Sequence, residues 1–194
     1  MKWATALLLL ASASVAAEKP RVPADEGWRP LFDGRDLAGW DTWLGIPHAS
    51  VQGLDRPRNA EGKYTEPLGL NVDPKHVFTV VIVDGAPAIR ISGEIFGALT
   101  STDAFDDFHV RLEFKWGEKK WPPKAEVVRD SGLLYYAVGE QGGADNKTWM
   151  QPGPDGAPVP LVKGRIQIQS EGAEVYYRNI AVRPISEFPK GYAP

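Results

Sequence analysis

The stretch FHVRLEFKW, residues 108–116, alternates strictly between apolar and polar side chains. Its apolar positions are Phe108, Val110, Leu112, Phe114 and Trp116. Its polar positions are His109, Arg111, Glu113 and Lys115. A period of two is typical of a strand with one face in the core and the other toward solvent. We therefore predict a half-buried β-strand at residues 108–116.

Other segments of the chain carry the same kind of pattern between Gly, Pro, Asn and Asp turn residues. Residues 77–83 are continuously apolar and predict a fully buried strand, which pairs with 88–92 across an Asp84-Gly85 turn. Further strands are expected at 98–102, 132–138, 164–170 and 175–183. Few segments have a helical period, so the pattern predicts an all-β chain folded as an antiparallel sandwich.

The first residues have the organisation of a secretory signal peptide. Lys2 supplies a positive start, Ala4 to Val15 is apolar, and small residues follow up to Ala17. The apolar run is too short to span a bilayer, so we predict a signal peptide at 1–17 rather than a buried N-terminal helix. The expected location is the periplasm or the extracellular space. Residues 18–27 form a polar leader that we expect to stay mobile.

Charge and cysteine content narrow the classes of partner. The formal net charge is −3, and it becomes −4 when residues 1–17 with their one Lys are removed. This balance disfavours nucleic acid and anionic membranes as partners, and we find no segment long enough to be a membrane span. The chain has no Cys, which excludes a disulfide scaffold and a lipid-anchored N-terminal cysteine.

Two segments lack any periodic pattern. Residues 53–74 are rich in Gly, Pro, Asn and Asp, and we expect a long loop there. Residues 139–163 contain four prolines and no periodic stretch. An unstructured stretch of this length is unusual inside a compact domain. It therefore indicates either a functional lid or missing strands.

Five segments, in this order along the chain, resemble the 3-keto-disaccharide hydrolase family. They are LFDGRDLAGW (31–40), FHVRLEF (108–114), DSGLLY (130–135), GRIQIQ (164–169) and EGAEVYYRNI (171–180). The resemblance implies a concanavalin-like or jelly-roll sandwich over residues 28–185, with a concave face that binds sugar and a tail at 186–194. It also implies a small-molecule carbohydrate as substrate.

The chain departs from the family pattern between Met150 and Asp155. The resemblance implies a strand with a Glu-x-Gln pattern, a strand with a Glu-Trp-Asn pattern and a hairpin at this point, and none of them is present. We interpret the departure as an internal deletion that leaves the sandwich incomplete. Exposed strand edges would then favour a partner chain or self-association.

Cleavage of a 3-keto-glycoside requires a base for the acidified C2 proton and a cation or hydrogen-bond donor for the keto oxygen. As catalytic candidates we name Glu113, Asp130 and Glu171. As substrate-binding candidates we name Arg129, Gln169, Arg178 and Trp121, the last as an exposed platform for a sugar ring.

Structural roles compete with each of these assignments. Glu113 would otherwise belong to a cross-strand charge ladder, Asp130 to a turn with a local ion pair, and Glu171 to an ion pair with Arg178. His109 is the only His on an expected strand, and the three His show no metal-ligand spacing. We assign no metal and no cofactor.

The sequence thus supports an exported hydrolase, or eliminating lyase, that acts on 3-keto-glycosides or 3-keto-disaccharides. A non-catalytic carbohydrate-binding sandwich or an inactive, truncated family member remains as the alternative, because one fold can serve all of these roles.

Overall fold

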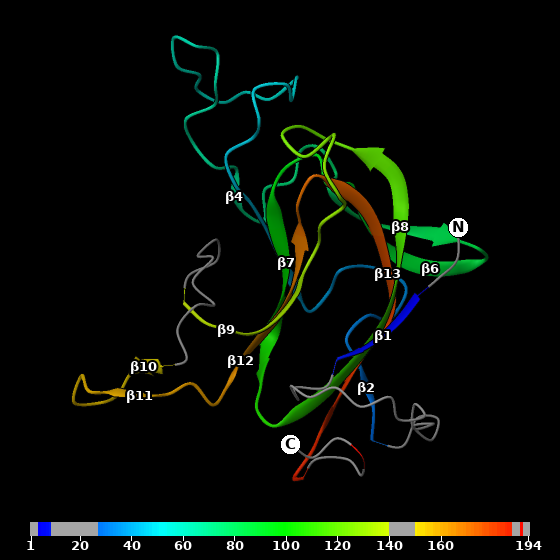
Figure 1. Ribbon diagram of the computed structural model, residues 1–194, viewed down its shortest axis with the longest axis vertical. Helices are drawn as coiled ribbons and strands as arrows, with labels where there is room; N and C mark the ends of the chain where they lie inside the picture. Colours follow the sequence, from blue (N-terminus) through cyan, green and yellow to red (C-terminus); the bar gives the residue numbers. More distant parts are fainter. Residues whose placement is uncertain (1–3, 9–26, 140–149, 188–190, 192–194) are drawn as a thin grey trace.

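The computed structural model describes residues 4–8, 27–139, 150–187 and 191. These residues form strands, turns and loops but no helix, and strands assemble into two antiparallel sheets that face each other (Figure 1). The all-β sandwich predicted from the sequence is therefore confirmed. Among the described residues no helix could cross a membrane.

The first sheet has the strand order β1-β8-β13-β6-β5, with β2 paired to another part of β13. Its long strands are β8 (Phe108–Lys120) and β13 (Ala173–Pro184), which pair over most of their length. The remaining strands are β1 (Ala4–Leu8), β2 (Arg29–Pro30), β5 (Phe78–Val83) and β6 (Ala86–Ile91). Strands β5 and β6 form the hairpin expected across Asp84-Gly85, where both residues have positive φ angles.

The second sheet has the order β4-β3-β7-β12-β9. Its strands are β3 (Trp40–Leu44), β4 (Gly69–Leu70), β7 (Gly97–Phe105), β9 (Leu133–Ala137) and β12 (Gly164–Ser170). A separate small hairpin joins β10 (Met150–Pro152) to β11 (Pro158–Pro160).

The core lies between the two sheets. The first sheet contributes Ile89, Ile91, Leu112 and Val175, and the second contributes Leu44, Leu99, Ile166 and Ile168. Val110 and Leu112 are 3% and 2% exposed, and Phe114 and Trp116 pack against the same cluster. The apolar positions of β8 therefore face the core as expected, and their burial stabilises the sandwich. At the polar position His109 the prediction of solvent exposure is wrong, because Trp28 covers the ring and leaves it 2% exposed.

All seven predicted strands are present, with ends that differ by a few residues. β3 was not predicted, and residues 4–8 form a strand paired to β8, whereas the sequence predicted the removed signal peptide there. The expected loop at 53–74 contains only one isolated bridge and the two-residue β4. Of the leader predicted at 18–27, residues 18–26 lie outside the described residues, as do residues 140–149.

Candidate functional site

One end of the sandwich contains a cleft of about 350 Å³. Its walls come from four separate parts of the chain. The lining side chains are Ile46, Pro47, His48, Ala49, Lys63, Tyr64, Glu94, Phe96, Pro122 and Pro123. This volume is at the lower end of the range found for small-molecule sites.

The loop that forms one wall of the cleft is fixed by Arg58. Its guanidinium donates to the carbonyl oxygens of Ala49, Val51 and Gly62 at 3.0, 2.9 and 2.7 Å. The same group lies 3.8 Å from the ring centre of Tyr64, whose hydroxyl donates to the Val51 carbonyl. Backbone carbonyls that would otherwise lack partners are thus satisfied, and the irregular segment is held in one shape.

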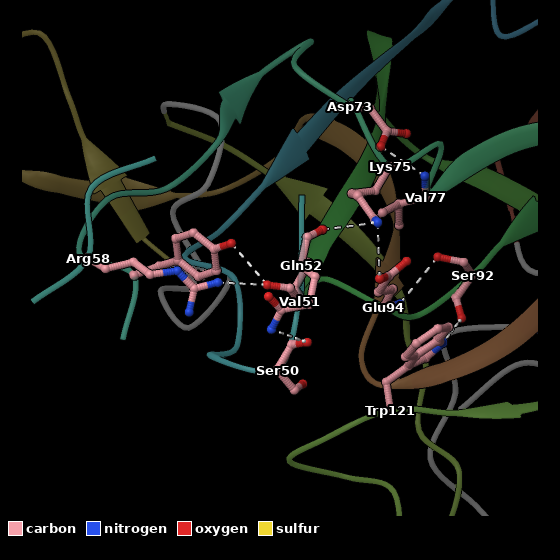
Figure 2. Close-up of polar contacts among 11 residues, drawn as sticks. Ser50, Val51, Gln52, Arg58, Asp73, Lys75, Val77, Ser92, Glu94 and Trp121 are labelled. Carbon is pink, nitrogen blue, oxygen red and sulfur yellow. Dashed lines mark hydrogen bonds and ion pairs between the residues drawn. The ribbon is translucent and has the colours of Figure 1, made fainter. Parts of the chain in front are cut away.

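Glu94 is the carboxylate of the cleft. Its side chain is 15% exposed, and its backbone N–H donates to the Ser92 hydroxyl at 3.2 Å. Lys75 approaches it with 3.7 Å between Nζ and Oε1, and the same ammonium donates to the Gln52 carbonyl at 3.3 Å (Figure 2). Glu94 is therefore a half-buried base candidate with a cation beside it.

His48 faces the cleft with a defined hydrogen-bonding pattern. The backbone N–H of Ser50 donates to its Nδ1 at 3.2 Å, and the Ser50 hydroxyl lies 2.8 Å from the same atom. Because Nδ1 accepts a hydrogen bond from a backbone amide, the neutral ring carries its proton on Nε2. His48 thus has one N–H available for donation.

A second group of charges, Lys124 with Asp130 and Glu171, adjoins the cleft; we call it the Lys124 cluster. Lys124 Nζ lies 2.7 Å from Asp130 Oδ2 and 2.8 Å from Glu171 Oε2. The hydrogen bond from Lys124 holds the pKa of Asp130 below its usual value, and the hydrogen bond to Asp130 raises the pKa of Lys124. Lys124 also lies 5.5 Å from the ring centre of Phe96, which lines the cleft.

The cleft and the Lys124 cluster are joined where Gly93 and Gly172 cross. A Cβ on Gly93 would lie 2.5 Å from the backbone of Ala173, and one on Gly172 would lie 2.9 Å from Lys124 Cβ. Both glycines have positive φ angles, and Gly172 N donates to Gly93 O at 3.1 Å. Trp121 N donates to Gly172 O at 2.8 Å, so three segments meet through their backbones. Only glycine fits both positions without strain.

Ser131 anchors the loop that carries Asp130. Its hydroxyl donates to the Gln169 carbonyl at 2.7 Å and lies 2.8 Å from the Tyr177 hydroxyl. Because Ser131 has one hydroxyl hydrogen, which the carbonyl takes, Tyr177 is the donor in the second bond. This chain of two hydrogen bonds connects the buried strand β13 to the loop beside the Lys124 cluster.

The structure brings together two of the three catalytic candidates, Asp130 and Glu171, on a shared lysine. Gln169 is adjacent, with its side-chain oxygen packed against Gly132. Arg129 is exposed and donates to the Glu118 carbonyl at 3.5 Å. Trp121 is half-buried and donates its indole N–H to the Ser92 carbonyl at 2.9 Å, which differs from the exposed platform that the sequence suggested.

Glu113 and Arg178 lie elsewhere, on the first sheet. Arg178 Nε donates to Glu113 Oε2 at 2.7 Å, and Asn179 donates to the other carboxylate oxygen. The expected pairing of Arg178 with Glu171 is therefore wrong, because the β8–β13 register places Arg178 opposite Glu113 while Glu171 turns toward Lys124. Glu113 lines a different hollow, beside Arg111 and Asn179.

Sequence reasoning missed His48, Lys63, Glu94 and Lys124 as site residues. Each lies in a segment with no period, and their proximity depends on how distant loops meet. The run Gly93-Glu94 directly after a buried strand was the one available signal. His109, the His on an expected strand, is 2% exposed and lies against Trp28 in a tilted arrangement, with 4.9 Å between ring centres. Within the described ranges, no three His, Asp or Glu side chains gather as metal ligands.

A family model described as the 3-keto-alpha-glucoside-1,2-lyase-like domain matches residues 27–155, which is well over half of the chain. The matched region includes the cleft and two members of the Lys124 cluster, and it ends before β12. No curated protein and no solved structure matches the chain.

Proposed function

Since the chain belongs to the 3-keto-alpha-glucoside-1,2-lyase-like domain family, we propose that it cleaves the glycosidic bond of 3-keto-glycosides in the cleft at Glu94. The observation that carries the proposal is the presence of a carboxylate, an ammonium and an imidazole N–H around one cleft of about 350 Å³. These are the three kinds of group that the reaction needs.

Glu94 is assigned as the general base. A carbonyl at C3 acidifies the C2 proton, and a half-buried carboxylate is suited to remove it. Lys63, which lines the cleft, is assigned to the enediolate oxygen that forms at C3, because a cation beside it stabilises the negative charge developing there. Phe96, Ile46 and Pro122 supply apolar surface for the C–H faces of the sugar ring.

The bond to the leaving group breaks when the enediolate electrons expel the C1 oxygen. The Nε2–H of His48 is assigned as the donor that protonates this oxygen, since its other ring nitrogen already accepts hydrogen bonds from Ser50. The product of this step is an unsaturated 3-keto sugar. Addition of water across its C1–C2 double bond then gives net hydrolysis, so lyase and hydrolase outcomes differ only in whether water adds.

The test measures turnover of a 3-keto-disaccharide, with the unoxidised disaccharide as the substrate control. Released aldose is expected only from the keto substrate. Glu94→Gln is expected to lower kcat by about 10²- to 10⁴-fold, the usual contribution of a general base. The matched control is Glu66→Gln, because Glu66 is an exposed carboxylate outside the cleft lining. Unchanged kcat in Glu94→Gln would refute the assignment.

A carbohydrate-binding domain without activity is the second candidate function. It is favoured by the end of the family match at residue 155, where the sequence departs from the family pattern. Saturable binding of the 3-keto-disaccharide by calorimetry, with no aldose released over hours, would support this candidate. Binding together with turnover would exclude it.

Export belongs to the same proposal. The charged start, the apolar run and the small residues up to Ala17 support removal of residues 1–17 during export to the periplasm or beyond. Expression with the natural start in a bacterial host, followed by N-terminal sequencing of the periplasmic fraction, tests it. A chain that keeps Met1 in the cytoplasm would contradict it.

A further inference from the structure

Without β1, strand β8 would be the edge strand of the first sheet. β13 pairs with one side of β8, and β1 pairs with the other over residues 110–114. In this pairing Ala6 lies opposite Leu112, in the middle of the five paired positions. The edge of β8 thus accepts an antiparallel strand over these residues.

The strand that covers this edge belongs to the segment whose removal is proposed above. β1 spans Ala4–Leu8, entirely within residues 1–17. After processing, β8 would present its unpaired N–H and C=O groups over 110–114, and such an edge is a template for another strand. An antiparallel strand can cover it, as β1 does.

We propose that the processed chain pairs this edge with the same edge of a second copy, antiparallel about a two-fold axis at Leu112. The inference rests on the proposed export and leaves the catalytic assignment untouched, because no cleft-lining residue belongs to β8. Two copies of β8 that pair in one sheet about a two-fold axis perpendicular to that sheet run antiparallel. β1 already pairs with β8 in this direction.

Charge and the length of the freed edge together select the register of the pairing. With the axis perpendicular to the sheet, opposite residues point to the same face, so one residue lies opposite its own copy and the axis passes midway between the two. Centring on Leu112 places Arg111 opposite Glu113 of the second copy, and Glu113 opposite Arg111. Centring on Arg111 or on Glu113 instead places like charges directly opposite each other, which is unfavourable. Centring on Phe114 would also oppose unlike charges, Glu113 and Lys115. Only the centre at Leu112 combines complementary charges with pairing of all five residues that β1 covers, 110–114, with one another.

The apolar face is also continuous in this register. Val110 lies opposite Phe114 of the second copy, and the two Leu112 side chains face each other across the axis. All three residues belong to, or pack against, the core of their own chain. The pairing therefore extends the apolar face of one sheet into the next, as expected for an isologous interface.

The first experiment measures the mass of chains 1–194 and 18–194 in solution by light scattering at about 100 μM. We expect a dimer for 18–194 and a monomer for 1–194, whose β1 covers the edge. A monomeric 18–194 would overturn the proposal. An unfolded 18–194 would overturn it as well, because the second copy is proposed to replace β1.

The second experiment tests the register by disulfide trapping. The chain has no Cys, so Arg111→Cys together with Glu113→Cys introduces the sole thiols. Directly opposite Cα atoms in an antiparallel pair are about 4.5–5.5 Å apart, within the range of disulfides. Oxidised 18–194 with both substitutions should form a covalent dimer on a non-reducing gel, while each single variant should remain uncrosslinked.

Efficient crosslinking of either single variant would overturn the register, because it places a residue opposite itself. The turnover assay on the same samples separates this inference from the proposed activity. A dimer without turnover would refute the activity and keep the interface, and turnover by a monomer would do the reverse.

Discussion

Tyr177 connects the core of the sandwich to the loop of Asp130, and its ionisation gives a quantitative test of that connection. The side chain is 4% exposed, and its hydroxyl donates to Ser131. Burial raises the pKa of Tyr177 to about 12, from an ordinary value of 10.0. The perturbation is Tyr177→Phe, which removes the ionisable group and one hydrogen bond but keeps the ring.

The expected effect on the free energy of unfolding changes with pH. Below pH 10 both the folded and unfolded states keep the proton, so the variant differs only by the lost bond, about 1 kcal/mol. Above pH 10 the unfolded chain loses the proton while the folded chain retains it until about pH 12. The wild-type chain thus loses about 1.4 kcal/mol of stability by pH 11 relative to the variant. The two stabilities should become nearly equal there.

The assay is urea unfolding of both proteins between pH 8 and pH 11, followed by tryptophan fluorescence. Ser131→Ala serves as the control, because it removes the hydrogen bond and keeps the buried phenol. It should retain the wild-type dependence on pH. A stability difference between wild type and Tyr177→Phe that stays constant from pH 8 to pH 11 would refute the reasoning.

Three further predictions concern buried charge, a buried histidine and the glycine crossing. Glu174 is 6% exposed and accepts hydrogen bonds from Arg90 Nε and two backbone amides. Glu174→Ala should lower the free energy of unfolding in urea by about 3 kcal/mol, and a decrease under about 1 kcal/mol would contradict this role. Burial, followed by the charges of Arg183 and Arg111, holds the pKa of His109 below 6.5. The folded chain should therefore lose stability as the pH falls below about 6.5. A His109→Phe variant that shows the same pH dependence in thermal unfolding would exclude His109 as the cause. Gly172→Ala should destabilise the chain by about 1–3 kcal/mol and lower turnover, because the new Cβ meets Lys124. A Gly172→Ala variant with the stability and turnover of the wild type would argue against a tight crossing.

The sequence predicted the strands whose burial differs between their two faces. The period of two at residues 108–116 and 164–170 reflects which side chains face the core, and that is a local property. β3 escaped prediction although Trp40, Trp43 and Leu44 follow the turn at Gly39, because a strand of five residues holds too few repeats to establish a period.

The candidate site was predicted only where its residues lie in recognisable segments. Asp130 and Glu171 come from such segments, and the structure places them on Lys124. Lys124 itself lies in a loop without a pattern, and its partners depend on where that loop meets the turn between β12 and β13. Glu94 was missed for the same reason, since its pairing with Lys75 joins distant parts of the chain.

The crossing of Gly93 and Gly172 has a consequence for how this chain can diversify. The alignment of the cleft with the Lys124 cluster is set there by backbone hydrogen bonds and by close packing against the two glycines. Substitutions along the rim, at exposed residues such as Ile46, can therefore accumulate without disturbing the frame that holds the charges. A saturation library should show two intolerant glycines beside freely variable rim positions, so that a lineage could acquire new sugar preferences while its architecture stays constant.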